Sequence, residues 1–132
     1  MRVRLKKPTR RYTEFTFGNV YRVIGIEADD YRIMNDDGQP YLYPAKLFEL
    51  IDRHQPESWI KRYGEDGEMY AYPHELSRPG FFEDWFEHKR SALATLELTL
   101  RRERESERKR VTKRQSAQTS AQTRSRRTVA VS

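Results

Sequence analysis

The chain has 132 residues, of which 36% are hydrophobic and 35% charged, and it contains no cysteine. This length allows one domain, and a mean hydropathy of -1.02 indicates that part of the chain lies outside the packed core. The absence of cysteine excludes disulfide scaffolds, thiol nucleophiles and cysteine-ligated metal sites. Because no run approaches the roughly 18 apolar residues of a membrane-spanning helix, we expect a cytoplasmic protein that does not contact a membrane.

The charge is divided unevenly along the chain. Residues 1–12 carry six basic and no acidic residues, residues 13–100 carry a net charge of -8, and residues 101–132 carry +8. We therefore expect a basic flexible leader (1–12), an acidic globular domain (13–100) and a basic end (101–132). This end begins as a charged helix and finishes as a disordered tail, because its QSAQTSAQT stretch has no apolar face.

The first part of the globular domain reads as strands and turns. Runs rich in β-branched and aromatic residues predict strands at about residues 20–26, 31–34, 41–43 and 50–52. Asp37-Gly38 is typical of a tight hairpin, because glycine tolerates a positive φ. A proline, Pro44, ends the third strand, and a single helical turn is expected over residues 45–49.

A second hairpin and a helix follow. Two aromatic-rich runs, residues 59–63 and 68–72, flank a turn with two glycines and predict the hairpin. From residue 81 the apolar residues recur at three- and four-residue steps, which predicts a helix to about Leu100. Trp85 lies on this apolar stripe, so we expect it to be largely buried. No apolar stripe continues beyond Leu100, which argues against a coiled coil and leaves the oligomeric state open.

The order of these elements is similar to that of a Src-homology-3-type barrel. The stretch LYPAKLFELID, residues 42–52, resembles the helical turn and last strand of that fold, and the resemblance covers residues 16–53. The segments GIEADDYRIMNDDGQPYLYP, EDGEMYAYP and RPGFFEDWF also resemble small bacterial proteins that pair such a barrel with a PGFFED-type helix start. The resemblance implies a mainly β fold: a small antiparallel Src-homology-3-like barrel, a hairpin and one C-terminal α-helix.

This resemblance does not extend to polyproline binding. No tryptophan lies within the expected barrel, and Leu47 stands where the helical turn usually presents an exposed aromatic ring. We therefore do not expect a groove for PxxP peptides.

No motif indicates catalysis, a cofactor or a metal. The histidines, His54, His74 and His88, show no ligand spacing, and neither a nucleophile elbow nor a glycine-rich phosphate loop is present. Paired carboxylates occur at expected turns and at the helix start, where they solvate loops and complement the helix dipole. We expect a protein that is not an enzyme, and a hydrolase using these carboxylates remains only a minor alternative.

The aromatic residues are the most informative feature. The chain has eight tyrosines, six phenylalanines and two tryptophans, more rings than so small a domain can enclose. Alternate residues of a strand share a face, so Tyr41 with Tyr43 and Tyr70 with Tyr72 are expected to form two ladders. The ladders either cover the helix or form a tyrosine-rich recognition patch ringed by carboxylates. The candidate partner-binding residues are Tyr41, Tyr43, Trp59, Tyr70 and Tyr72.

Two functions of different classes follow. The first is a non-catalytic module that binds another protein through an acidic, tyrosine-rich face, by analogy with an immunity or inhibitor-type partner of a basic protein. The alternative is a nucleic-acid-associated accessory protein that binds through its basic N- and C-terminal ends. The candidate residues for this alternative are Arg101, Arg102, Arg104, Arg108, Lys109, Arg110, Lys113 and Arg114.

Overall fold

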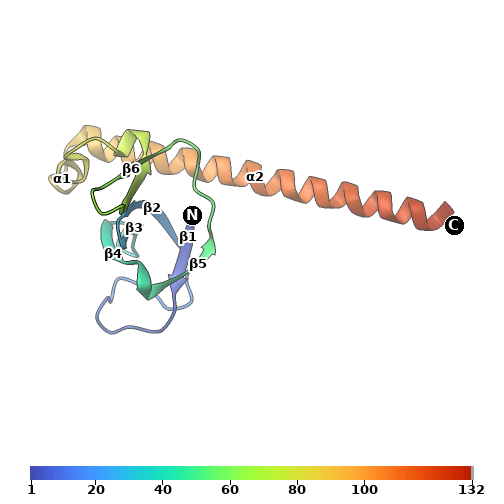
Figure 1. Cartoon of the computed structure of the whole chain (residues 1–132), viewed down its shortest axis with the longest axis horizontal. Helices are drawn as coiled ribbons and strands as arrows, with labels where there is room; N and C mark the ends of the chain where they lie inside the picture. Colours follow the sequence, from blue (N-terminus) through green and yellow to red (C-terminus); the bar gives the residue numbers. More distant parts are fainter. Residues whose placement is uncertain (132) are drawn as a thin grey trace.

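The protein is mainly β, with one long C-terminal helix (Figure 1). The computed structural model describes the backbone of residues 1–131 and the side chains of residues 1–118. Within residues 1–131, the strands are β1 (Arg2–Leu5), β2 (Tyr21–Glu27), β3 (Asp30–Met34), β4 (Pro40–Pro44), β5 (Phe48–Asp52), β6 (Trp59–Tyr63) and β7 (Met69–Pro73). The helices are the 3-10 turns η1 (Ala45–Leu47) and η2 (His74–Leu76), the short α1 (Phe81–Phe86) and α2 (Arg90–Val131).

All strand pairs are antiparallel, and five strands lie in the order β4-β3-β2-β1-β5. The one-turn helix η1 follows Pro44 and leads into β5, as the sequence predicts. The first half of β2 pairs with β1, and its second half pairs with β7, where Ile26 lies opposite Ala71. The strand β7 also pairs with β6. The sheet does not close over residues 1–131, so the closed barrel stays a prediction.

The prediction of a flexible leader is wrong for residues 2–5, which form β1 between β2 and β5. Val3 and Leu5 are buried in the core, whereas Arg2 and Arg4 alternate with them and form ion pairs with Glu107 and Glu49. The period of two in this segment is the pattern of a half-buried strand. The high density of positive charge in residues 1–12 hides that pattern in the sequence.

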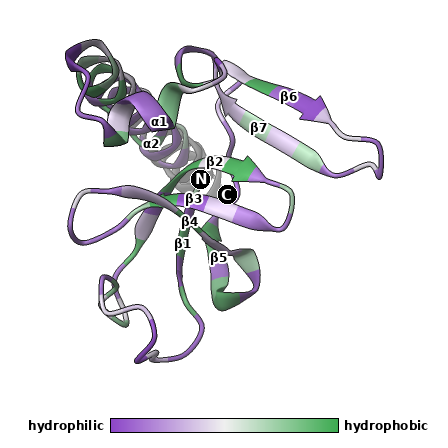
Figure 2. Cartoon of the chain, turned by 90° about the vertical axis from the view of Figure 1, so that its left-hand side faces the viewer, coloured by the Kyte–Doolittle hydropathy of each residue, from purple (hydrophilic) through white to green (hydrophobic). Residues whose placement is uncertain are grey.

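Two apolar clusters lie on opposite sides of β2. Val23 belongs to the cluster inside the bent sheet, together with Ile33 and Phe48. Ile24, the next residue, belongs to a second cluster between the sheet and the helices, together with Phe81. Both β2 side chains are fully buried, because successive residues of a strand face opposite sides and both sides are covered here. Figure 2 shows the apolar colouring of β2 between the other strands and the helices.

The predicted single helix is broken into α1 and α2. His88 adopts a φ of 59° between the two helices, and the backbone N–H of Lys89 donates to the carbonyl of Asp84. The Asp84 carboxylate also accepts from Lys89 and Arg78, which fixes the break. Trp85 packs against the second cluster but is only partly buried, less than the sequence predicts.

The second helix continues to Val131, through the residues expected to form a disordered tail. No glycine or proline lies between Arg90 and Val131, so nothing in the backbone chemistry ends the helix earlier. The side chains of the last part of this predicted tail, residues 119–132, lie outside the described residues.

A row of polar contacts holds the first half of α2 against the sheet. The Trp59 indole N–H donates to Glu103 at 2.9 Å, and Arg110 donates to Asp52 at 2.6 Å. Between them, Glu107 pairs with both Arg2 and Arg22. Burial raises the pKa of Glu103 although the Trp59 hydrogen bond and the charge of Arg22 act in the opposite direction. Beyond this row α2 projects past the strands (Figure 1).

Candidate protein-binding site

Two predicted partner-binding residues, Tyr43 and Trp59, are buried, with exposed fractions of 3% and 6%. The Tyr43 hydroxyl donates to Glu14 at 2.8 Å and accepts from the Asn35 amide at 3.0 Å. Burial raises the pKa of the Tyr43 phenol above its ordinary value. These contacts place Tyr43 in the fold's core, and Trp59 fixes α2 through its bond to Glu103.

Tyr41 lies in a different environment from Tyr43. Its ring is 44% exposed and packs on Phe86 of α1, with a centroid distance of 4.9 Å. The predicted ladder on β4 is therefore not formed as a single surface. The interpretation that tyrosines cover the helix is correct for Tyr41 and its contact with α1.

Tyr72 lies in a polar network on the helix side of the sheet. Its hydroxyl donates to Glu27 at 2.6 Å and accepts from Arg32 at 2.7 Å, while Arg32 and Glu27 form an ion pair at 2.9 Å. The Tyr72 ring packs on Phe82 and also covers Gly25, where an added Cβ would lie 2.0 Å from a ring carbon. Burial raises the pKa of Tyr72. This network fixes β7 on β2.

Tyr70 and Tyr63, in contrast, are open to solvent. Their exposed fractions are 37% and 69%, and neither ring makes an aromatic contact or hydrogen bond with the described side chains. Tyr63 is not among the predicted site residues. It shares a strand face with the buried Trp59, but it lies four residues further along a hairpin that projects beyond the core (Figure 2). Tyr63 is exposed and Trp59 is buried because Tyr63 lies further from the core, and the alternation of residues along a strand does not encode this distance.

A shallow groove runs along the face of the β6–β7 hairpin that carries Tyr70 and Tyr72. In the antiparallel register, Ile60 lies opposite Tyr72 and Arg62 opposite Tyr70. The groove has a volume of about 280 Å³, and its remaining walls come from Ser77 and Pro79. Aromatic and aliphatic side chains thus form a concave surface on one side of the hairpin, where a chain segment of a partner can pack.

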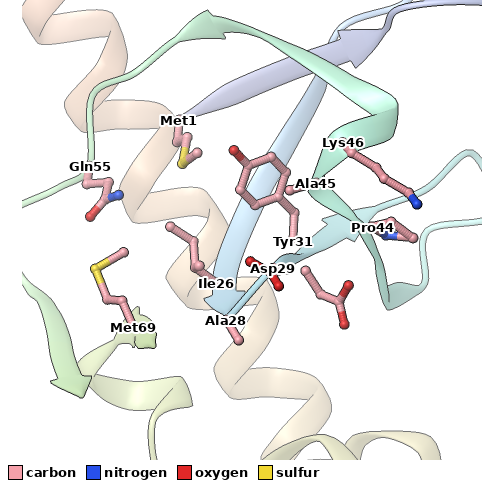
Figure 3. A pocket seen from close by; sticks show the side chains of 11 residues that line it. Met1, Ile26, Ala28, Asp29, Tyr31, Pro44, Ala45, Lys46, Gln55 and Met69 are labelled. Atoms are coloured by element: carbon pink, nitrogen blue, oxygen red, sulfur yellow. The ribbon is translucent and has the colours of Figure 1, made fainter. Parts of the chain in front are cut away.

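A larger pocket opens at the same end of the sheet (Figure 3). It has a volume of about 730 Å³ and lies between the β2–β3 turn, η1 and the start of β7. The Tyr31 ring lies in the middle of the view, with Met1, Ile26 and Met69 on one side and Lys46 on the other. We call this cavity the Tyr31 pocket; its remaining lining residues are Ala28, Asp29, Asp30, Pro44, Ala45 and Gln55.

Carboxylates gather around the groove and the pocket. The Ala28 N–H donates to the Met69 carbonyl, which brings the β2–β3 turn beside the start of β7 and the β6–β7 turn. This end of the sheet, which we call the hairpin end, carries five carboxylates without an ion pair among the described side chains, at Asp29, Asp30, Glu65, Asp66 and Glu68. Its basic residues are Lys46, Lys61 and Arg62. The hairpin end therefore combines the exposed tyrosines Tyr63 and Tyr70 with a small excess of negative charge.

The basic residues proposed for nucleic-acid binding separate into two groups along α2. Three of them form ion pairs: Arg101 with Glu97 (3.4 Å), Arg102 with Glu75 (3.7 Å) and Arg110 with Asp52 (2.6 Å). Five have no ion pair with any side chain that the structure describes: Arg104, Arg108, Lys109, Lys113 and Arg114. All five cations are exposed: Arg104, Arg108 and Lys109 lie within the segment that is held against the sheet, and Lys113 and Arg114 lie beyond it.

Among residues 1–118, no three histidine, aspartate or glutamate side chains converge as a metal site requires. No helix within the described residues is both long and apolar enough to cross a membrane. No protein-family model, curated protein or solved structure matches the chain.

Proposed function

We propose that the protein is a non-catalytic module that binds another protein through its hairpin end. The observation that carries this proposal is that Tyr63 and Tyr70 are exposed and unpartnered on opposite faces of one projecting hairpin, where Tyr70 lines the concave surface. Tyrosine is enriched at protein interfaces, because its ring gives a large contact area at low entropic cost while its hydroxyl stays hydrated. A few such rings carry most of the binding energy of an interface.

The rigid attachment of the β6–β7 hairpin at its base supports the same proposal. Tyr72, Glu27 and Arg32 pin the base of the hairpin, and Trp59 ties it to α2 through Glu103. A surface held in this way loses little conformational entropy when it binds, which favours affinity. The unpaired carboxylates favour a basic partner, which they would also attract over a distance. An immunity- or inhibitor-type action on a basic protein is the finer form of this proposal.

The barrel type and the cellular location of the protein are also part of this proposal. The strand order β4-β3-β2-β1-β5, with η1 before β5, supports a Src-homology-3-like barrel within a small bacterial protein. We place its action in the cytoplasm, where a protein without cysteine is compatible with reducing conditions.

Affinity purification from the producing cells tests the proposal when three forms of the full chain are compared. The forms are the unaltered protein, a Tyr63→Ser/Tyr70→Ser variant, and a helix variant in which the five unpaired cations of α2 become glutamine. We expect one protein to be retained by the first and third forms and reduced about tenfold with the second, because interface tyrosines concentrate binding energy. Equal retention by all three forms would contradict the proposal.

The five unpaired cations of α2 favour a second candidate, the nucleic-acid-associated protein. Lysine and arginine on an exposed helix bind phosphates without reading the sequence, and salt weakens such binding steeply. The helix variant should then lose most binding to a duplex or a single strand at physiological salt, while the tyrosine variant keeps it. Deletion of residues 101–132 is unsuitable for this purpose, because it also removes Glu103, Glu107 and Arg110, which hold α2 on the sheet.

A further inference from the structure

We infer that the Tyr31 pocket receives a basic side chain, an arginine in the first place, from the partner protein. The inference rests on the proposed protein-binding function and names the chemistry that its partner would present. The pocket is large enough, at about 730 Å³, for a complete arginine side chain and part of its backbone. It also opens at the hairpin end, where its lining residue Met69 lies opposite Tyr63 in the register, so a partner seated on Tyr63 would lie next to it.

The polar groups of the pocket are mainly acceptors without donors. The carboxylates of Asp29 and Asp30 have neither a hydrogen bond nor an ion pair with any side chain that the structure describes. The Gln55 side-chain oxygen is buried, and no donor within the described residues reaches it. Two carboxylates without a cationic partner at the cavity favour a ligand that supplies charged N–H groups. A guanidinium supplies five such donors.

The apolar part of the pocket fits the rest of an arginine side chain. Met1, Ile26 and Met69 form one wall, against which the aliphatic stem can pack (Figure 3). The Tyr31 ring packs in part against the first cluster, and it also lines the cavity without an aromatic partner among the described side chains, so a planar cation in the cavity can contact it. A guanidinium over such a ring gains cation–π attraction, and arginine does so more often than lysine.

Lys46 is the cation that lines this pocket, and it supplies the matched control. Its ammonium group forms no ion pair with a described carboxylate, although Asp29 and Asp30 line the same cavity. A lysine in this position competes with an incoming cation for the two carboxylates. Replacing Lys46 with glutamine should therefore tighten binding, whereas neutralising the carboxylates should weaken it.

The three methionines give a direct readout. Met1 and Met69 line the Tyr31 pocket, whereas Met34 packs with the second cluster beside α2. The full chain, carrying ¹³C-methyl methionine, is titrated with N-acetyl-arginine amide and, separately, with N-acetyl-citrulline amide, its neutral isostere. We expect the arginine probe to shift the Met1 and Met69 methyl resonances with a millimolar Kd, and the Met34 resonance to stay in place.

The variants then identify the contacts. Asp29→Asn/Asp30→Asn should weaken arginine binding about tenfold, as expected when charge-assisted hydrogen bonds become neutral ones. An unchanged Met34 resonance shows that the variant is folded. Equal shifts with citrulline, no shift at Met1 and Met69, or an unchanged affinity in the double variant would each overturn the inference.

The arginine pocket and the proposed protein-binding function can each be rejected without rejecting the other. The titration needs no partner, so it tests the pocket even if the hairpin end binds no protein. Conversely, partner capture that is lost with Tyr63→Ser/Tyr70→Ser but kept with Asp29→Asn/Asp30→Asn would uphold the protein-binding function and reject the arginine pocket.

Discussion

Each of the two hairpins has a strand with two tyrosines spaced two residues apart, but the environments of these tyrosines differ. The β3–β4 hairpin presents Tyr41 and Tyr43, and the β6–β7 hairpin presents Tyr70 and Tyr72, each pair two residues apart. On β4, one ring packs on α1 and the other is buried with its hydroxyl hydrogen-bonded. On β7, Tyr72 is fixed beneath Phe82, and Tyr70 is left open.

The difference lies in what covers each hairpin. The β3–β4 hairpin lies under α1 and beside the loop that carries Glu14, so both tyrosines of β4 find partners. The β6–β7 hairpin is covered only at its base and projects beyond the other strands (Figure 2). The two tyrosines of β4 therefore stabilise the fold, whereas Tyr63 and Tyr70 on the second hairpin are free to bind. The predictions below test this division.

The largest effect is expected at Tyr43. Tyr43→Ala removes a buried ring that packs against Phe15 at a centroid distance of 4.5 Å and leaves the Asn35 amide without its acceptor. The free energy of unfolding should fall by about 3–5 kcal/mol, as for other buried aromatic truncations. Urea denaturation followed by circular dichroism measures this change. A loss below about 1 kcal/mol would place Tyr43 outside the core and break the comparison.

Gly25→Ala tests whether the Tyr72 ring stabilises the fold by packing on Gly25. The new Cβ would lie 2.0 Å from Tyr72 Cε1, so the ring must move away from Glu27 and Arg32. The cost should be about 1–3 kcal/mol, typical of an overpacked site. The same substitution made in a Tyr72→Leu protein should cost clearly less. Equal costs in the two backgrounds would show that Tyr72 does not press on Gly25.

The pH dependence of stability that Asp52 causes tests whether α2 is held on the sheet from which the hairpin projects. Burial alone would raise the pKa of Asp52, but the His54 N–H and the Arg110 guanidinium outweigh it and lower the pKa from 3.8 to about 2. The unfolded chain therefore binds this proton more readily than the folded chain. The resulting stability, about 1–2 kcal/mol, is present above pH 4 and is lost as the pH falls toward 2.

Asp52→Asn should remove this dependence. Its unfolding free energy should be lower than that of the unaltered protein at pH 6, and the difference should shrink as the pH falls from 4 to 2. Thermal unfolding across this range gives the comparison, with Glu49→Gln as the control at an exposed ion pair on the same strand. A constant difference at every pH would contradict the assigned Asp52–Arg110 contact.

The smallest effect on stability is expected at Tyr70. Tyr70→Ala removes a ring without an aromatic contact among the described side chains, so the free energy of unfolding should change by less than about 0.5 kcal/mol. Binding to the partner should nevertheless fall. Calorimetry of the variant measures the first quantity, and a loss of more than about 2 kcal/mol would assign Tyr70 to the fold instead.

The sequence predicted the elements that depend on local chemistry. Asp37-Gly38 marks the β3–β4 turn, and the proline before Ala45 marks the 3-10 turn that leads into β5. It did not predict β1, where arginines alternate with Val3 and Leu5 and hide the apolar face. It also did not predict the break at His88, because this depends on how Asp84 bonds to Lys89 after folding.

The site was predicted only in part for a related reason. Alternation along a strand places residues on a face, but it does not say how far that face is covered. Tyr70 is exposed as a recognition residue requires, Trp59 and Tyr43 are buried by contacts from distant segments, and Tyr63 emerges only once the hairpin's projection is known. Exposure at the end of a hairpin is a tertiary property, so a period of two in the sequence cannot encode it.

Site-specific photo-crosslinking tests the division between the two hairpins most directly. A photoreactive phenylalanine derivative is placed at Tyr70 in one protein and at Tyr41 in another, and both proteins are irradiated in extracts of the producing cells. Both positions are exposed, at 37% and 44%, so access to the reagent is comparable. We predict one specific crosslinked protein from position 70 and none from position 41. The same product from both positions, or a product from position 41 alone, would contradict the assignment of binding to the β6–β7 hairpin.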